Sequence, residues 1–498
     1  MQLEYLLNIL LSPETLLWLA IGCVVGAVLG ALPGMSADTG IAIFLPITYN
    51  LHPITGLVCL AAIYVTGSYG GNITAVLLNT PGTSDSYFMT IDGYPMTKQG
   101  LGMKAIRITT VSAFVGGIIG GFMLLFIAPP LAQIAVEFGP LELFLTSMMG
   151  IIVIVSMAKG NMMRGLMSAC LGFLFALVGP DAIYGNYRFT LGVEEVYDGL
   201  PLLAVVLGLF AVSQLFSLME SLEIQEAIDD KAFDGGIRKI LKSIPDHVRI
   251  LWSDIVSGII GAFVGIIPAA GTTVAAGISY NLMKNTDKHP EEYGNGAEKG
   301  LGSVTAANNA VVGGSLVPLL TLGIPGNATS ALFLGGLLVH GLQPGIQLFT
   351  NSPETSYGLI WGLILANFSI LIIGLFGGPI YGKVTKVPKE VLIPVIGALC
   401  MLGAYCFRSS IFDMGLIVVF GIIGWLMNKT NIPIAPFVLA FVLGNNNEMQ
   451  LRRALLLYGE GIGSKILQPI PMVLIFLNII LLVSPFIPNI MAKFRKKN

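Results

Sequence analysis

Apolar runs of about 18 residues or more, the length that crosses roughly 30 Å of hydrocarbon as a helix, recur along the whole chain. Four of them are residues 108–127, 201–219, 359–380 and 466–490. Only 11% of the 498 residues are charged, against about 25% in soluble globular proteins. So few charges cannot cover a water-facing surface. The sequence therefore predicts an all-α polytopic membrane protein.

The positions of the charged residues predict the orientation of the chain. No Lys or Arg precedes Lys98, whereas the chain ends in KFRKKN, so the excess of basic residues on the cytoplasmic side places the C-terminus inside and the N-terminus outside. The start of the chain lacks the pattern of a cleaved secretory signal, so its first apolar run is expected to remain as a span. A net charge of −2 argues against nucleic acid as a partner.

An internal duplication divides the chain into two halves. GAVLGALP at residues 26–33 returns as GAFVGIIP at 261–268, and GGNITAVLLNTPGTSDS at 70–86 parallels GSLVPLLTLGIPGNATS at 314–330. Later, Pro140-Leu-Glu142 resembles Pro388-Lys-Glu390. We predict a first transmembrane repeat at residues 1–222, a cytoplasmic linker at 223–249, a second repeat at 250–460, and a final span with a basic cytoplasmic tail at 461–498.

The charges of equivalent loops predict that the two repeats are inverted. Residues 92–107 contain Lys98, Lys104 and Arg107, but the equivalent residues 341–358 contain no Lys or Arg. Conversely, residues 129–140 contain no Lys or Arg, and the equivalent residues 383–389 contain three lysines. A loop that is inside in one copy is then outside in the other, as in inverted-repeat secondary transporters. A parallel duplication with accidental loop charges is the alternative.

Each repeat contains a Pro-Gly pair that should break a helix inside the membrane. Proline removes a helix donor and glycine permits a positive φ, so Pro81-Gly82 and Pro325-Gly326 are expected to interrupt their segments. Freed backbone groups must be buried in protein or line a wet cavity. Two such breaks, one in each repeat, predict broken helices or hairpins that meet near the bilayer midplane and form a binding site there.

The residues around these breaks are the candidate site. Residues that cap helix N-termini follow each Pro-Gly, so a helix is expected to restart there with free N–H groups that favour an anion. No Lys or Arg lies within either motif, so a cation bound with the ligand is expected to balance the charge. The candidate substrate-binding residues are Asn72, Asn79, Thr80, Gly82, Thr83, Ser84, Asn308, Asn309, Gly323, Gly326, Asn327 and Thr329, with possible sodium sites near Asp38, Asn79 and Asn309.

These residues also have plainer interpretations. Small residues often line packing faces between membrane helices, and that interpretation is favoured for Gly26 with Gly30 and for Gly261 with Gly265. For the asparagines a ligand role is favoured, because an amide in an apolar segment costs free energy unless it is paired. Asp38 is either a cation ligand or a residue at the wet end of a segment.

Nothing in the sequence predicts catalysis. No GxSxG, HExxH, P-loop or dinucleotide-binding motif occurs, and the histidines show no metal-ligand spacing. We therefore predict a protein that is not an enzyme and has no cofactor. A channel or structural membrane subunit and an intramembrane enzyme are the competing hypotheses.

Five blocks of the sequence resemble, in order, those of the large membrane subunit of the tripartite tricarboxylate transporter family: GALPGMSADTGIAIFLPITY, IYVTGSYGGNITAVLLNTPGT, IDGYPMTKQG, AANNAVVGGSLVPLLTLGIPG and GLLVHGLQPG. The matching positions are Gly70, Gly71, Asn79, Thr80, Pro81, Gly82 and Thr83 in the first copy, and Asn308, Asn309, Gly323, Pro325 and Gly326 in the second.

The resemblance implies a role in transport. Such a subunit is expected to lie in the bacterial cytoplasmic (inner) membrane and to work with a small membrane subunit and a periplasmic solute-binding protein. Together they would import citrate or other carboxylates, driven by an ion gradient that is commonly sodium, with a proton as the alternative. The chain departs from the family pattern at Thr305, where a glutamate is usual, and at Asp85, Tyr87 and Phe88, where small residues are usual. A smaller or differently charged ligand than citrate is therefore also compatible with the sequence.

Overall fold

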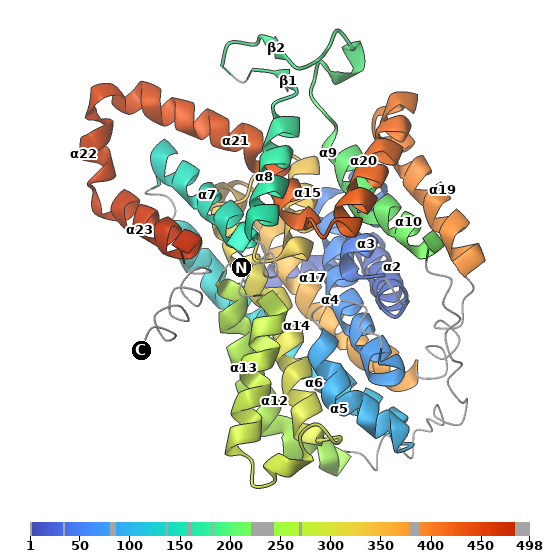
Figure 1. The fold of residues 1–498 in the computed structure, drawn as a ribbon. Coiled ribbons are helices and arrows are strands. Elements are labelled where there is room, and N and C mark those ends of the chain that lie inside the picture. Colours follow the sequence, from blue (N-terminus) through green and yellow to red (C-terminus); the bar gives the residue numbers. More distant parts are fainter. Residues whose placement is uncertain are drawn as a thin grey trace, which may run out of the picture.

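The computed structural model of the chain describes residues 2–32, 35–79, 86–134, 138–156, 162–181, 183–220, 244–267, 271–377 and 389–483. Across these ranges the fold is almost entirely helical (Figure 1). Eight of the described helices are long and apolar enough to cross a membrane, and a bent pair at residues 434–482 makes up to nine. The prediction of an all-α polytopic membrane protein is confirmed. Residues 223–243 of the predicted linker at 223–249 and the basic end of the C-terminal tail lie outside the described residues, and residues 244–249 form the start of helix α12.

The first half of the chain contains four of the eight candidate membrane spans, several shorter helices and a small hairpin. Its helices are α1 (Gln2–Leu11), α2 (Pro13–Gly30), α3 (Ala37–Tyr49), α4 (Pro53–Leu78), α5 (Tyr87–Lys98), α6 (Gly102–Ile134), α7 (Pro140–Ser156), α8 (Met162–Ala176), η3 (Glu194–Val196), α9 (Leu202–Val206), η4 (Leu207–Val212) and α10 (Ser213–Glu220). Between α8 and η3, β1 (Gly179–Pro180) pairs antiparallel with β2 (Tyr187–Arg188).

The second half repeats much of this plan. Its helices are α12 (Ile244–Ile266), α13 (Gly271–Thr286), η6 (Pro290–Glu292), α14 (Glu298–Leu322), α15 (Ala328–Val339), α16 (Ile346–Asn351), α17 (Pro353–Phe376), α19 (Lys389–Arg408), α20 (Ile411–Lys429), α21 (Ile434–Tyr458), η7 (Gly459–Gly461), α22 (Ile462–Ile466) and α23 (Pro469–Val483). The run at residues 466–490, expected as one span, starts at a bend of 75° that the sequence did not predict.

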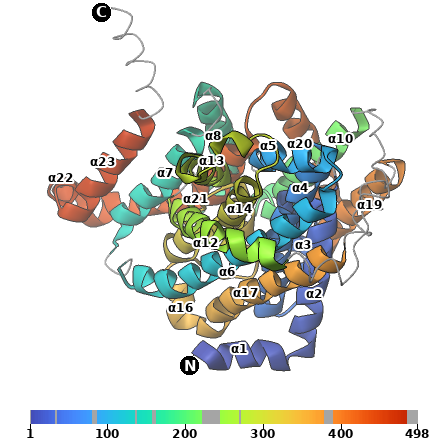
Figure 2. The same cartoon turned by 90° about the horizontal axis from the view of Figure 1, so that it is seen from below.

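The two helices that carry the duplicated motif form the centre of the molecule. Within the most apolar window of each span, 89% of the residues of α4 and 100% of those of α14 are buried, more than in any other described span. Seen from below, α14 lies in the middle with α12, α13, α4 and α6 around it (Figure 2). Both helices are rich in Gly, Ala, Ser, Thr and Asn, which suit close helix contact better than a lipid-facing surface.

Glycine contacts in the two halves match residue for residue. In each half a glycine of the outer helix, α2 or α12, faces a backbone carbonyl of the central helix, α4 or α14, or a central glycine faces an outer carbonyl. Equivalent residues are 235 apart in the outer helices and 244 apart in the central helices. The matching contacts are Gly26 with Ile63 and Gly261 with Ala307, Gly30 with Gly67 and Gly265 with Val311, and Gly70 with Ala27 and Gly314 with Ala262. A side chain at any of these glycines would crowd the carbonyl it faces. The duplication is therefore structural, and the packing interpretation of Gly26, Gly30, Gly261 and Gly265 is supported.

The two central helices run in opposite directions where they touch. The Asn308 amide donates to the Asn72 amide oxygen at 3.1 Å, and the hydroxyls of Tyr64 and Ser315 lie 3.0 Å apart. Residue numbers fall along α4 as they rise along α14, so the helices are antiparallel. This is the relation that inverted repeats require of their central helices. The sidedness of the two halves in a membrane stays a prediction.

The matched glycines lead to a first prediction. Replacing Gly261 with valine should separate α12 from α14 and lower the free energy of unfolding by about 1–3 kcal/mol, because a packed backbone contact cannot absorb a side chain. The control is Gly415→Val in α20, where an added Cβ meets nothing within 4 Å. Thermal unfolding of the detergent-purified variants is the measurement, and equal midpoints for the two would contradict the packing role.

Candidate binding site

Both central helices end at a left-handed residue. Asn79 follows α4 with φ 56° and ψ 21°, and Gly323 follows α14 with φ 71° and ψ 19°. Gly323 N–H bonds the Leu319 carbonyl at 2.9 Å, and Ile324 N–H bonds that of Pro318 at 3.2 Å, a common way to satisfy the last carbonyls of a helix. The helices thus end two residues before each Pro-Gly pair. The candidate residues Thr80, Gly82, Thr83 and Ser84 lie outside the described part of the chain.

The predicted restart after the second break is confirmed. Asn327 is the N-cap of α15: its amide oxygen accepts from Ser330 N–H at 2.8 Å, and the Ser330 hydroxyl oxygen accepts from Asn327 N–H at 2.9 Å. The Asn327 amide nitrogen also donates to the Tyr64 hydroxyl at 2.8 Å. One side chain therefore caps the restarted helix and ties it to α4 of the other half.

Polar groups from both halves meet beside this cap. Tyr64 of α4 contacts Ser315 of α14 and Asn327, and Thr329 donates from its hydroxyl to the Asp38 carboxylate at the start of α3. We call Asp38, Tyr64, Ser315, Asn327 and Thr329 the junction cluster. Gly326 lets this segment lie against α14, since a Cβ there would be 2.9 Å from the Cβ of Ser315.

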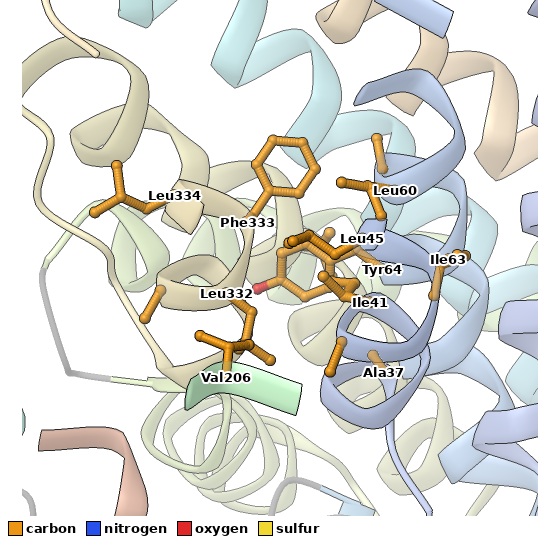
Figure 3. Packing of buried hydrophobic residues seen from close by; sticks show 14 of the residues in the cluster. Ala37, Ile41, Leu45, Leu60, Ile63, Tyr64, Val206, Leu332, Phe333 and Leu334 are labelled. Carbon is orange, nitrogen blue, oxygen red and sulfur yellow. The ribbon is translucent and has the colours of Figure 1, made fainter. Parts of the chain in front are cut away.

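Buried apolar side chains fix the position of the Tyr64 ring. Figure 3 shows the ring among side chains of α3, α4, α15 and α9: Ala37, Ile41, Leu45, Leu60, Ile63, Val206, Leu332 and Phe333. These residues are all buried. Because packed side chains hold one rotamer, the hydroxyl is presented to the junction cluster in a fixed direction.

A second polar group lies further along the crossing, and we call Asn72, Asn308 and Asn309 the amide cluster. All three side chains are at most 2% exposed. The Asn72 amide nitrogen and both amide atoms of Asn309 have no hydrogen-bond partner among the residues that the structure describes. An unpaired buried polar group costs about 1–3 kcal/mol. Such groups in the centre of a membrane protein suit a polar ligand or water that completes their bonds.

The structure brings together some of the predicted residues and separates others. Asn72 meets Asn308, Asn327 meets Tyr64, and Thr329 meets Asp38 across the two halves. Asn79 lies seven residues beyond Asn72 on α4, and Gly323 lies eight beyond Ser315 on α14. Because the helices are antiparallel, Asn79 and Gly323 lie on opposite sides of the crossing, each about 10 Å or more along its helix from the nearest contact. The two clusters lie between them.

Tyr64 and Ser315 were not among the candidates from sequence. A signal was present, because the offset of 244 aligns Tyr64 with Asn308, so that both copies carry a polar side chain at that place. As for metal ligands, the described residues contain no group of three or more His, Cys, Asp or Glu side chains that could hold an ion. Asp38 is the one carboxylate in the junction cluster, and a cation site near it stays a prediction.

Two antiparallel copies of a broken membrane helix, with buried amides and hydroxyls at their crossing, define a polytopic membrane transport protein. The chain belongs to the tripartite tricarboxylate transporter TctA family, whose model matches residues 16–439.

Two relatives from Agrobacterium vitis are similar to this chain. The "Uncharacterized 52.8 kDa protein in TAR-I ttuC' 3'region" is 33% identical over 486 residues, which cover 97% of this chain and 95% of the relative. The "Uncharacterized protein in TAR-II ttuC' 3'region" is 32% identical over 233 residues, 47% of this chain and 96% of the relative. No solved structure matches the chain.

The junction cluster leads to a second prediction. Thr329→Val removes the donor to Asp38 and should lower uptake per inserted protein by about tenfold, the equivalent of one lost bond of about 1.4 kcal/mol. Thr321→Val is the matched control, because this buried threonine bonds only the Val317 carbonyl of its own helix. Uptake of a radiolabelled carboxylate by the assembled complex is the readout. Equal uptake by both variants would exclude a role for the Asp38–Thr329 contact.

Proposed function

We propose that this chain is the large permease subunit of a binding-protein-dependent secondary transporter that imports tricarboxylates or other small carboxylates. Its proposed place is the cytoplasmic (inner) membrane of a bacterium, where an ion gradient drives uptake. The family match over residues 16–439 supports the role of large subunit. The observation that carries the proposal is the antiparallel crossing of α4 and α14, with unpaired amides buried at its centre.

The crossing offers an anion dipoles rather than a fixed positive charge. No Lys or Arg lies between Thr305 and Thr329, so hydroxyls, amides and the N-terminus of α15 are the groups available to a carboxylate. A cation bound with the substrate balances its charge. We propose sodium, with a proton as the alternative, and Asp38, Asn79 and Asn309 as the residues near which sodium binds.

Two partners complete the proposed transporter. A periplasmic solute-binding protein captures the carboxylate and delivers it to the outer face, and a small membrane subunit packs against this chain within the bilayer. The chain has no proposed catalytic role, since the family is one of transporters. A binding-protein requirement separates this proposal from a channel, which would conduct without one.

The structure supports the proposed orientation in the membrane. Basic side chains gather where α14 begins: Lys104 pairs with Glu298 at 2.6 Å, Lys299 pairs with Asp287 at 2.9 Å, and the neighbouring Gln99 bonds the Asn295 carbonyl at 3.0 Å. At the other end of α14, Gly345 N–H bonds the Leu320 carbonyl at 2.8 Å and starts α16. The basic end is the proposed cytoplasmic side.

A third prediction tests this orientation. Lys98 is the last residue of α5, next to Gln99, which bonds the loop before the basic end of α14, and Gln347 lies in α16 at the opposite end of α14. Cysteines at these two positions should therefore react with a membrane-impermeant reagent from opposite sides. The exposed Cys170 is first replaced by serine to remove its background signal. Labelling of Lys98→Cys and Gln347→Cys from the same side would rule out the inverted arrangement.

A fourth prediction tests the transport function. Membrane vesicles that contain both membrane subunits should accumulate a radiolabelled carboxylate in a saturable way, and only when the binding protein is added. A panel of citrate, succinate and malate serves as the probe. Collapse of the sodium gradient should stop accumulation if sodium is the coupling ion, and unchanged accumulation would make the proton the candidate. Unsaturable flux without the binding protein would contradict the proposal and indicate a channel.

A further inference from the structure

An acidic side chain that sequence analysis did not single out lies inside the membrane region. Asp254 belongs to α12, in the apolar segment at residues 247–266, and its side chain is 0% exposed. One carboxylate oxygen accepts from the Ser112 hydroxyl of α6 at 2.8 Å. The other, Oδ1, has no hydrogen-bond or ionic partner in the described ranges. Acidic residues within membrane spans are costly and usually functional.

A glycine packs directly against the unpaired oxygen. Gly302 of α14 faces this site, and a Cβ there would lie 2.6 Å from Asp254 Oδ1 and 3.0 Å from the Ser112 hydroxyl oxygen. The Cδ1 atom of Ile250 would lie 3.2 Å from the same Cβ. Three helices, α6, α12 and α14, therefore enclose this carboxylate, and a side chain at position 302 would crowd its unpaired oxygen.

The groups around the Asp254 carboxylate suit a proton better than a metal cation. An ionised carboxylate buried without a counter-charge is strongly unfavourable, so Asp254 must bind a cation or be neutral. A metal cation needs several oxygen ligands, and transporters usually supply them from unwound backbone. Here α6, α12 and α14 are continuous, so their carbonyls are engaged in helix bonds, and within the described residues the Ser112 hydroxyl is the group that bonds Asp254.

We propose that Asp254 is a proton-carrying residue of the transport cycle, neutral in the conformation described here. The inference rests on the proposed transport function and deepens it, because it takes the proton, the alternative coupling ion, and assigns it a site that is separate from the junction cluster. In one conformation the carboxylate takes a proton from water on one side of the membrane. In the alternate conformation it releases that proton to water on the other side, so one proton crosses per cycle.

Among the described groups around it, Asp254 is the acid that pairs with no basic side chain and accepts from no backbone N–H group. On the helices packed against it, the titratable and charged groups lie towards the basic end: Lys104 and Arg107 on α6, His247 and Arg249 on α12, Tyr280 and Lys284 on α13, and Glu298 and Lys299 on α14, with Asp92 of α5 against Gly300. Lys104 and Glu298 pair with each other, and Lys299 pairs with Asp287. Asp92 accepts from three backbone N–H groups, those of Gly294, Gly296 and Ala297.

The site also lies close to the amide cluster. Asn309 follows Gly302 by seven residues on α14, which is about 10 Å along a helix. Between them, Ser257 lies one turn after Asp254 on α12, and its buried hydroxyl has no partner within the described residues. A change in the protonation of Asp254 therefore acts on helices that also carry the proposed substrate groups.

The first experiment uses the complete complex in proteoliposomes with trapped pyranine, a pH-sensitive dye, and radiolabelled citrate, succinate and malate as probes. In wild type, an imposed pH gradient should drive accumulation, and uptake should carry protons that the dye detects. Asp254→Asn mimics the neutral acid, so it should keep exchange of labelled for unlabelled carboxylate at equal pH. It should lose proton-driven accumulation down to the level of empty vesicles.

The matched control is Asp413→Asn. Asp413 is equally buried in α20 but lies 3.9 Å from Arg408, so its replacement should leave both exchange and proton-driven accumulation unchanged. Accumulation by Asp254→Asn at the wild-type rate would overturn the proton role and leave the transport proposal intact. Wild-type accumulation under a sodium gradient but not under a pH gradient would also overturn the proton role. If the wild-type complex accumulates no carboxylate under either gradient, the transport proposal itself fails.

A second measurement does not depend on transport. Infrared spectroscopy of the purified protein should show the C=O band of a protonated carboxyl that is absent in Asp254→Asn and shifted in Ser112→Ala, which removes the hydrogen bond to Oδ2. A wild-type spectrum without any band that depends on Asp254 would show that the residue is ionised and would overturn the inference, whatever the uptake assay gives.

Discussion

The close contact between glycines and backbone carbonyls of neighbouring helices is the constraint on which the rest of the fold depends. At Gly26, Gly30 and their equivalents Gly261 and Gly265, two helices approach so closely that no side chain fits between them. Within a bilayer, helix association cannot rely on expelling water, so this close packing supplies the attraction. It also buries α4 and α14 completely enough that they can carry amides and hydroxyls that lipid would not tolerate.

Much of this architecture could be predicted from the sequence because local sequence patterns determine it. Apolar runs of sufficient length indicated the spans, and the offsets of 235 and 244 between repeated blocks identified the helices that are equivalent. The end of α14 and the restart of α15 at Asn327 followed from the conformational preferences of glycine, proline and asparagine. Each apolar run, each repeated block and each helix cap is a pattern of residues that lie within a few turns of one another.

The partners of these residues could not be predicted, because they join faces of helices far apart in the chain. Tyr64 bonds Asn327, 263 residues away, and Ser112 bonds Asp254, 142 residues away. Nor could a pattern of residues tell on which side of the crossing each helix end falls. Asn79 and Gly323 occupy equivalent places in the repeat, yet the antiparallel crossing separates them, so the groups at the centre are those of the helix middles, Asn72 and Asn308.

For the proposed transport cycle, the bonds that join the two halves offer a way in which substrate and coupling ion would act on one another. Asn72–Asn308, Tyr64–Asn327 and Ser112–Asp254 each pair a residue of the first half with one of the second, at different levels of the same interface. In a transporter that works by movement of one repeat against the other, all three must be exchanged together. A substrate that satisfies the amide cluster, and a proton that neutralises Asp254, then each change the free energy of that single rearrangement. Their coupling needs no direct contact between substrate and proton, only that both bias the same two-state interface.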